Sequence, residues 1–228
     1  MEGDSPAVEL RQHTLRPGTR DTMVRVFEEH FIEEQERCGM RVLGQFRDLG
    51  NPDRFVWLRG FADMEARTRA LEAFYTCPVW MKHRDEANAT MLDHTNVLLL
   101  KPAGPGLGFR FDPRLRPPPD AVEAPGGVVV ATIFHLAAGA WPDVLAPVAG
   151  ESAGGPAALL AWLVTKPVRN GYPRLPIRED ANVVVSVAAY PRAEDYRPPA
   201  VSSPAVTRVE HLRLAPTRRS FLRHPPLL

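Results

Sequence analysis

Apolar and polar residues alternate along several short stretches of this chain, and between these stretches the apolar positions recur at helical spacing. The alternation predicts half-buried strands, and the longer period predicts amphipathic helices. Over the first hundred residues the predicted elements are strand Val8–Leu15, helix Thr19–Arg37, strands Met40–Leu49 and Phe55–Phe61, a helix capped by Asp63 that runs to Tyr75, helix Val79–Leu92, and strand His94–Pro102. This order, βαββαβ, is that of a ferredoxin-like unit.

The second half repeats the strands of the first half but not its helices. Matching strands are predicted at Val128–Gly139, Ala158–Lys166, Asn182–Pro191 and Thr207–Pro216. Of the helices only a short one at Trp141–Gly150 is expected, because residues 191–204 contain too many prolines for a helix. A repeat that keeps its strands but not its helices indicates two sheets packed on each other. We therefore predict an α+β protein made of tandem duplicated ferredoxin-like units that pack sheet to sheet.

Proline and glycine divide the chain into segments. We expect an N-terminal domain at residues 7–102, a connector at 103–126, a degenerate C-terminal domain at 127–216 and a basic tail at 217–228. The connector is too rich in proline and glycine for a helix or a ladder, and its aromatic residues Phe109 and Phe111 indicate that it lies against the protein. The tail is expected to be a solvated terminus, with a partner-docking arm as the alternative.

Composition excludes several classes of function. The net charge of +1 over 228 residues argues against broad binding to nucleic acid or to an anionic membrane. The N-terminus resembles no secretory signal, and no apolar stretch is long enough to cross a bilayer. Two cysteines provide neither a disulfide framework nor a metal cluster. We expect a cytoplasmic protein that binds neither nucleic acid nor membrane.

The first half also resembles a known family. Four stretches are similar, in this order, to a NIPSNAP domain: VELRQHTLRPGTRDTMVRVFEEH, GMRVLGQFRDLGNPDRFVWLRGFADMEARTRAL, PVWMKHRDEANATML and NVLLLKPA. This resemblance implies membership of the dimeric α+β barrel superfamily, in which two ferredoxin-like units from two chains or from one duplicated chain press their sheets together. Relatives in that superfamily include cofactor-free monooxygenases, haem enzymes and isomerases, so the fold does not choose a reaction.

The predicted N-terminal sheet has two chemically different faces. One face is apolar and carries Val8, Leu10, Val56, Leu58, Leu98 and Leu100; the other is polar and carries Glu9, Arg11, His13, Trp57, Arg59, and Gln45 or Arg47. Unpaired burial of Arg11 and Arg59 would be costly, so Glu9 or a bound anion is the expected partner. Two interpretations stay open: an ion-pair network that locks the two sheets together, or a ligand pocket that Arg59 faces.

Several residues could line such a pocket. Trp80, His83 and Ala87 share one face of the last predicted helix, where a histidine is either a core residue with its hydrogen bonds satisfied or a general base. His30, His13 and Tyr75 could reach the same space. We predict catalytic roles for His83, Arg59 and His13, and substrate contacts from Trp57, Trp80, Tyr75, His30 and Phe27.

Searches for cofactor and metal motifs find nothing. The sequence contains no P-loop, no GxGxxG after a strand, no GxSxG, no HExxH and no paired CxxC. No cofactor and no metal are therefore expected, with a haem bound by His135 or His211 as the alternative. The function favoured is that of a cofactor-independent monooxygenase, isomerase or cyclase of secondary metabolism, acting on an apolar or aromatic metabolite between the N-terminal sheet and its helices. The alternative is a non-catalytic binding or interaction protein, and a homodimer is left open.

Overall fold

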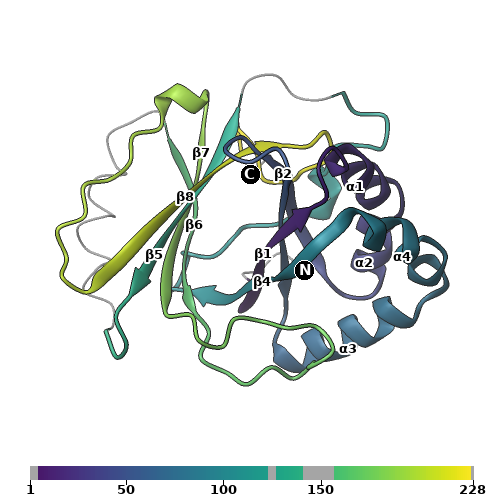
Figure 1. The fold of residues 1–228 in the computed structure, drawn as a ribbon, viewed down its shortest axis with the longest axis horizontal. Coiled ribbons are helices and arrows are strands. Elements are labelled where there is room, and N and C mark those ends of the chain that lie inside the picture. Colours follow the sequence, from purple (N-terminus) through teal and green to yellow (C-terminus); the bar gives the residue numbers. More distant parts are fainter. Residues whose placement is uncertain (1–4, 123–126, 141–156, 227–228) are drawn as a thin grey trace.

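The computed structural model describes residues 5–122, 127–140 and 157–226, and its eight strands close into one barrel (Figure 1). The strands follow one another around the barrel in the order β1-β3-β2-β8-β5-β7-β6-β4. Their bounds are β1 Ala7–Leu15, β2 Arg41–Asp48, β3 Arg54–Phe61, β4 Met91–Pro102, β5 Val128–Leu136, β6 Ala158–Thr165, β7 Val183–Tyr190 and β8 Val206–Pro216. All of the paired strands are antiparallel.

The order of strands shows the duplication directly. The first half contributes neighbours β4-β1-β3-β2, and the second half contributes β8-β5-β7-β6 in the equivalent order. The two halves join where β2 pairs with β8 and where β4 pairs with β6. The prediction of two ferredoxin-like units that pack sheet to sheet in one chain is therefore confirmed.

The helices of the first half lie on one side of the barrel (Figure 1). They are α1 Arg20–Val26, a π-helical stretch at Phe27–Phe31, α2 Ile32–Arg37, α3 Met64–Thr76 and α4 Pro78–Thr90. Asp63 caps α3 as predicted, because its carboxylate accepts a hydrogen bond from the backbone N–H of Ala66 at 2.6 Å. The helix predicted at Trp141–Gly150 lies outside the described residues, and residues 193–195 form a single 3₁₀ turn.

The two faces of the N-terminal sheet meet different surroundings. Its apolar face points into the barrel, where Val8, Leu10 and Val56 pack with Val129, Ile133, Leu163 and Val185 of the second half. Its polar face points toward the helices, together with Trp57 and Phe55. The ionic residues therefore lie between the sheet and the helices. The interpretation in which they lock the two sheets together is wrong, because the contact between the sheets is apolar.

The connector and the C-terminal segment close part of the barrel. Phe109 and Phe111 of the connector are buried in the barrel core, and Phe111 packs against Phe221 with ring centroids 4.8 Å apart. The expectation of a solvated tail is wrong, because Phe221, Leu222 and Ser220 are buried. The apolar side chains of this segment pack into the protein although the segment also carries basic residues.

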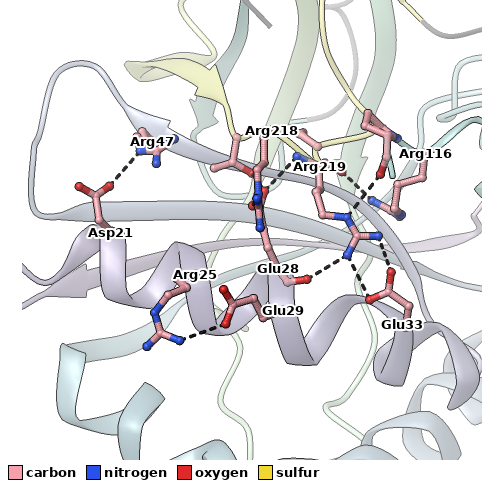
Figure 2. Close-up of polar contacts among 12 residues, drawn as sticks. Asp21, Arg25, Glu28, Glu29, Glu33, Arg47, Arg116, Arg218 and Arg219 are labelled. Carbon is pink, nitrogen blue, oxygen red and sulfur yellow. Dashed lines mark hydrogen bonds and ion pairs between the residues drawn. The ribbon is translucent and has the colours of Figure 1, made fainter. Parts of the chain in front are cut away.

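A buried glutamate fastens the C-terminal segment to the first helical run (Figure 2). The Glu28 carboxylate accepts hydrogen bonds from the Thr217 hydroxyl at 2.6 Å, from Arg218 Nε at 2.7 Å and from the backbone N–H of Arg219 at 3.0 Å. Arg219 also donates to the Glu28 carbonyl at 2.9 Å and pairs with Glu33. The first helix is thus held from outside by the far end of the chain.

Candidate functional site

A cavity of about 490 Å³ lies between the N-terminal sheet and its helices. Its lining comes from three places in the chain. The sheet contributes Arg11, His13 and Trp57; the helices contribute Met23, Phe27, Phe31, Gln35, Phe74, Tyr75, Trp80, Arg84, Ala87 and Asn88; the rest comes from Met91, Leu92, His94, Tyr172, Arg174 and Leu175. The volume falls within the range of small-molecule sites, about 300–1,000 Å³.

A cluster of charged side chains lies on the sheet side of the cavity. Glu9 is fully buried, and its carboxylate contacts three guanidinium groups. Arg11 and Arg59 each lie 2.8 Å from Glu9 Oε2, and Arg67 from α3 lies 2.6 Å from Oε1. The carboxylate accepts one charge-assisted hydrogen bond from each arginine, so it is fully satisfied.

The Glu9 carboxylate stays ionised in the ordinary pH range. Burial opposes the ionised form of Glu9, but the three arginines outweigh it and hold the pKa of this carboxyl well below its usual range. Burial also lowers the pKa of Arg11, and Arg59 adds to that effect while Glu9 opposes it. With Glu9 ionised and three arginines around it, two positive charges in the cluster remain uncompensated by this carboxylate.

His13 is a buried imidazole on the sheet side of the cavity. Burial lowers its pKa well below the usual value, and the positive charge of Arg11 lowers it further. The ring is therefore neutral near pH 7. Trp57 Nε1 donates to His13 Nε2 at 3.3 Å, so the remaining ring proton sits on Nδ1, which is buried without a partner. His13 presents a donor here, and its acceptor nitrogen is already occupied.

Aromatic side chains form the helix side of the cavity. Phe31 packs against Trp80 at 5.4 Å and Phe74 at 5.7 Å between ring centroids, and Phe27 packs edge-on against Trp57 at 4.9 Å. Phe27 and Phe31 begin and end the π-helical stretch that interrupts the first helical run. Such wide turns are frequent at functional sites, and this one carries two lining residues.

The second half of the chain supplies the last part of the wall. The loop between β6 and β7 reaches across to α3 (Figure 1), where the Tyr172 ring stacks on Tyr75 with centroids 6.3 Å apart. Arg67 Nη1 donates to Asn170 Oδ1 at 3.1 Å, and Asn170 in turn donates to the Leu175 carbonyl at 2.9 Å. The same arginine therefore contacts both Glu9 and the loop.

The structure brings five of the eight predicted site residues into the cavity lining and leaves three outside it. His13, Trp57, Phe27, Tyr75 and Trp80 line the cavity. Arg59 lies in the Glu9 cluster and contacts Gln35 Oε1 at 3.2 Å. His30 and His83 stack on each other with centroids 3.6 Å apart, half-buried between the first helical run and α4.

The sequence pattern does not mark several residues of the cavity and of the Glu9 cluster. It places Arg11 on the polar face without a role, and it does not mark Arg67 of the cluster or the cavity residues Tyr172 and Leu175. Alternation along β1 could have marked Arg11, because it lies between Glu9 and His13 on the same face. No local pattern marks Arg67, whose partners lie 58 and 103 residues away along the chain.

Within the described parts of the chain, no group of three or more His, Cys, Asp or Glu side chains could hold a metal ion. In the same residues, no helix combines the length and the apolar character needed to cross a membrane.

Comparison with protein families places the cavity in a known type of domain. Residues 8–104 match the model of the NIPSNAP family. The match confirms the resemblance of the first half to a NIPSNAP domain and ends close to the end of β4, so the matched region carries the sheet and the helices that enclose the cavity. A search of curated proteins gives no significant match.

Solved structures resemble this chain over different lengths. A NIPSNAP-like domain protein from Burkholderia xenovorans is 27% identical, covers 47% of this chain and 96% of its own, and gives a TM-score of 0.41. A protein from Fusobacterium nucleatum described as a putative monooxygenase covers 97% of this chain and 98% of its own, with 9% identity and a TM-score of 0.56. One from Lactobacillus acidophilus with the same description covers 93% and 94%, with 11% identity and a TM-score of 0.54. The last two show that the whole duplicated barrel is a recurrent fold.

Proposed function

We propose that this protein binds an apolar or aromatic metabolite in the cavity between the N-terminal sheet and its helices. The observation that carries the proposal is the aromatic lining of the cavity, to which Phe27, Phe31, Phe74 and Trp80 contribute ring faces and edges. Such rings favour flat organic molecules, which they hold by offset and edge-to-face packing. Among the described residues, the side chains that both sheets turn into the barrel form one apolar cluster.

We further propose that the bound molecule is transformed without a cofactor, by a monooxygenase, isomerase or cyclase type of reaction. The two structures described as putative monooxygenases share the fold of the whole chain, which supports the first of these types by analogy of fold. His13 and Arg11 are the lining residues placed to act on a substrate, His13 through its Nδ1–H and Arg11 through its charge. Both would stabilise electron density that develops on the substrate.

A specific observation favours the second candidate, a non-catalytic binding protein. Trp57 occupies the acceptor nitrogen of His13, so this imidazole cannot remove a proton from a ligand in the observed arrangement. Of the other histidines predicted at the site, His83 as a catalytic residue and His30 as a substrate contact both lie outside the cavity lining. His94, the other imidazole of the lining, is then the remaining candidate base, and without it a substrate would have to enter already deprotonated.

As part of the same proposal we assign the protein to small-molecule biosynthesis in the cytoplasm. Cys38 and Cys77 are both free thiols, which is in keeping with a reducing compartment.

Ligand binding is tested first with planar aromatic probes and thermal melting. Binding should raise the melting temperature of the native protein. Trp80→Ala removes a ring from the cavity wall, so it should abolish that rise. Trp162→Ala is the matched control, because Trp162 lies on the other sheet and is absent from the cavity lining; it should lower stability but keep the rise. Equal loss of the rise in both variants would refute this site. Oxygen uptake and product analysis are then measured with the probe that binds most tightly. Conversion of that probe would indicate an enzyme, and recovery of the unchanged probe would indicate a binding protein.

A further inference from the structure

The cavity is lined by positively charged and neutral side chains. Its described lining contains three arginines and two histidines but no aspartate or glutamate. The two outer arginines have acids beside them, since Arg84 lies 3.4 Å from Asp85 and Arg174 lies 3.9 Å from Glu72. These pairs leave little net charge at that edge. The positive excess of the cavity therefore comes from its sheet side.

The sheet side holds this excess in a dry environment. Arg11, Arg59 and Arg67 are each 1% exposed or less, and they share the single carboxylate of Glu9. The other partners of these two arginines include neutral groups: Arg59 donates to the Gln35 amide oxygen and contacts the Met40 sulfur, and Arg67 donates to the Asn170 amide oxygen. Buried charges without a counter-charge are costly, and the cost falls when an anion arrives.

Two buried donors next to the cavity also lack partners. Arg11 Nε makes no hydrogen bond, and its Nη2 reaches the His94 carbonyl only at 3.5 Å. His13 Nδ1 has no partner either, and Trp57 occupies the other ring nitrogen. Buried donors are almost always paired in folded proteins, and an orphan one is a reason to look for a missing acceptor. Arg11 and His13 both line the cavity, so an acceptor there would lie beside both.

We infer that the ligand of this cavity is an aromatic anion, a carboxylate or an acidic phenol or enol, whose negative group lies against Arg11 and His13. The inference rests on the proposed function and adds the charge of the ligand to it. The aromatic body packs among Phe27, Phe31 and Trp80, and the anionic group supplies the counter-charge that the Glu9 cluster lacks. A flat carboxylate suits the planar fork of an arginine, and the tautomer of His13 adds a second donor.

The test uses four probes that share a naphthalene ring: 2-naphthoate, 2-naphthol, the neutral amide 2-naphthamide and the cation 2-naphthylmethylammonium. Dissociation constants are measured by calorimetry with the full chain at pH 7. We expect 2-naphthoate to bind at least ten times more tightly than the amide, and the cation to bind most weakly. For 2-naphthol, affinity that rises as the pH approaches the pKa of the phenol would identify a phenolate or enolate ligand, whereas constant affinity would assign the site to carboxylates.

Arg11→Met isolates the charge. The side chain keeps its length, and Glu9 keeps its contacts with Arg59 and Arg67, so the fold should persist. The affinity for 2-naphthoate should fall by about 10- to 100-fold, as expected for the loss of one charge-assisted hydrogen bond, while the affinity for the amide stays the same. Arg69→Met is the matched control, because Arg69 is 63% exposed on α3 and outside the cavity lining; it should change neither affinity.

The outcomes distinguish this inference from the proposed function. Equal affinity for the naphthoate and the amide would overturn the anion assignment while the aromatic site stands. Equal loss of both affinities in Arg11→Met would also overturn it, because that pattern indicates altered packing. If none of the four probes binds, the proposed function fails and the inference fails with it. A His13→Phe variant that loses tight binding of the naphthoate but keeps the amide would support the second donor.

Discussion

Replacing Glu9 by glutamine should destabilise the protein more than replacing any one of the arginines around it. Glu9→Gln removes the carboxylate that three buried guanidinium groups share. Removing one partner of a buried ion pair typically costs about 3–5 kcal/mol, and three partners are stranded here, so we expect the upper end of that range.

Arg59→Met should cost less, although Arg59 is fully buried. Glu9 keeps Arg11 at 2.8 Å and Arg67 at 2.6 Å, and the repulsion between Arg59 and Arg11 disappears. The free energy of unfolding should then fall by about 1.5–3 kcal/mol, because one charged hydrogen bond is lost and the side-chain volume changes little. The two single variants should therefore differ by about 2 kcal/mol. With a urea m-value of about 3 kcal/mol/M, the difference shifts the denaturation midpoint by about 0.7 M.

Urea denaturation of the two single variants and of the double variant measures these terms. The double variant should lose less than the sum of the single losses, because Glu9 and Arg59 contact each other. The exposed pair Glu65 and Arg69 on α3 is the control. Its two single variants and its double variant should leave the urea denaturation midpoint nearly unchanged. If Arg59→Met proves as destabilising as Glu9→Gln, the arginines do not carry uncompensated charge, and the reasoning about the cluster is refuted.

Three further outcomes can be checked. The pKa of Glu9 is lower in the folded state than in the unfolded chain, where it is about 4.3. The ionised carboxylate therefore stabilises the fold fully above that pH, and this stabilisation is lost as the pH falls further. Glu9→Gln should flatten the acid side of a plot of unfolding free energy against pH, and an unchanged slope would contradict this. Glu28→Gln should cost about 2–3 kcal/mol and expose the C-terminal segment to carboxypeptidase, because three donors lose a charged acceptor; digestion no faster than in the native protein would contradict it. Gly60→Ala should cost about 1–3 kcal/mol, since the added Cβ would lie 2.2 Å from the Ser5 hydroxyl, and Ser5→Gly should relieve that cost.

The strands were readable from the sequence because their faces differ. Alternation along Val8–Leu15 separates a dry face from a polar one, and the structure keeps that separation, with the dry face in the barrel. The repeat of four such strands was enough to predict the duplicated barrel. Which face the helices cover could not be read, because Glu9 and Arg11 are unusual residues for either buried face. The answer depends on the pairing of side chains, which a single strand does not show.

The candidate site was predictable only where its residues belong to one element. His13 and Trp57 lie on strands whose pattern marked them, and Trp80 lies on a helix face. The loop residue Tyr172 comes from the other half of the chain, so no local pattern connects it with Tyr75. The C-terminal segment was misjudged for a related reason: its charges were weighed, but its partner Glu28 lies nearly the whole chain away.

Tyr172 and Leu175 belong to the second half of the chain, while most of the cavity belongs to the first. A site assembled from two separate chains would come apart on dilution, and its affinity would follow the protein concentration. In this molecule the loop is tethered to the site that it completes, so its effective concentration is fixed by the chain itself. The cavity should keep the same affinity from nanomolar to micromolar protein. The covalent link also lets the two halves diverge in sequence. In a dimer of identical chains a substitution would appear in both copies, whereas here a substitution in the loop changes one wall of this cavity alone.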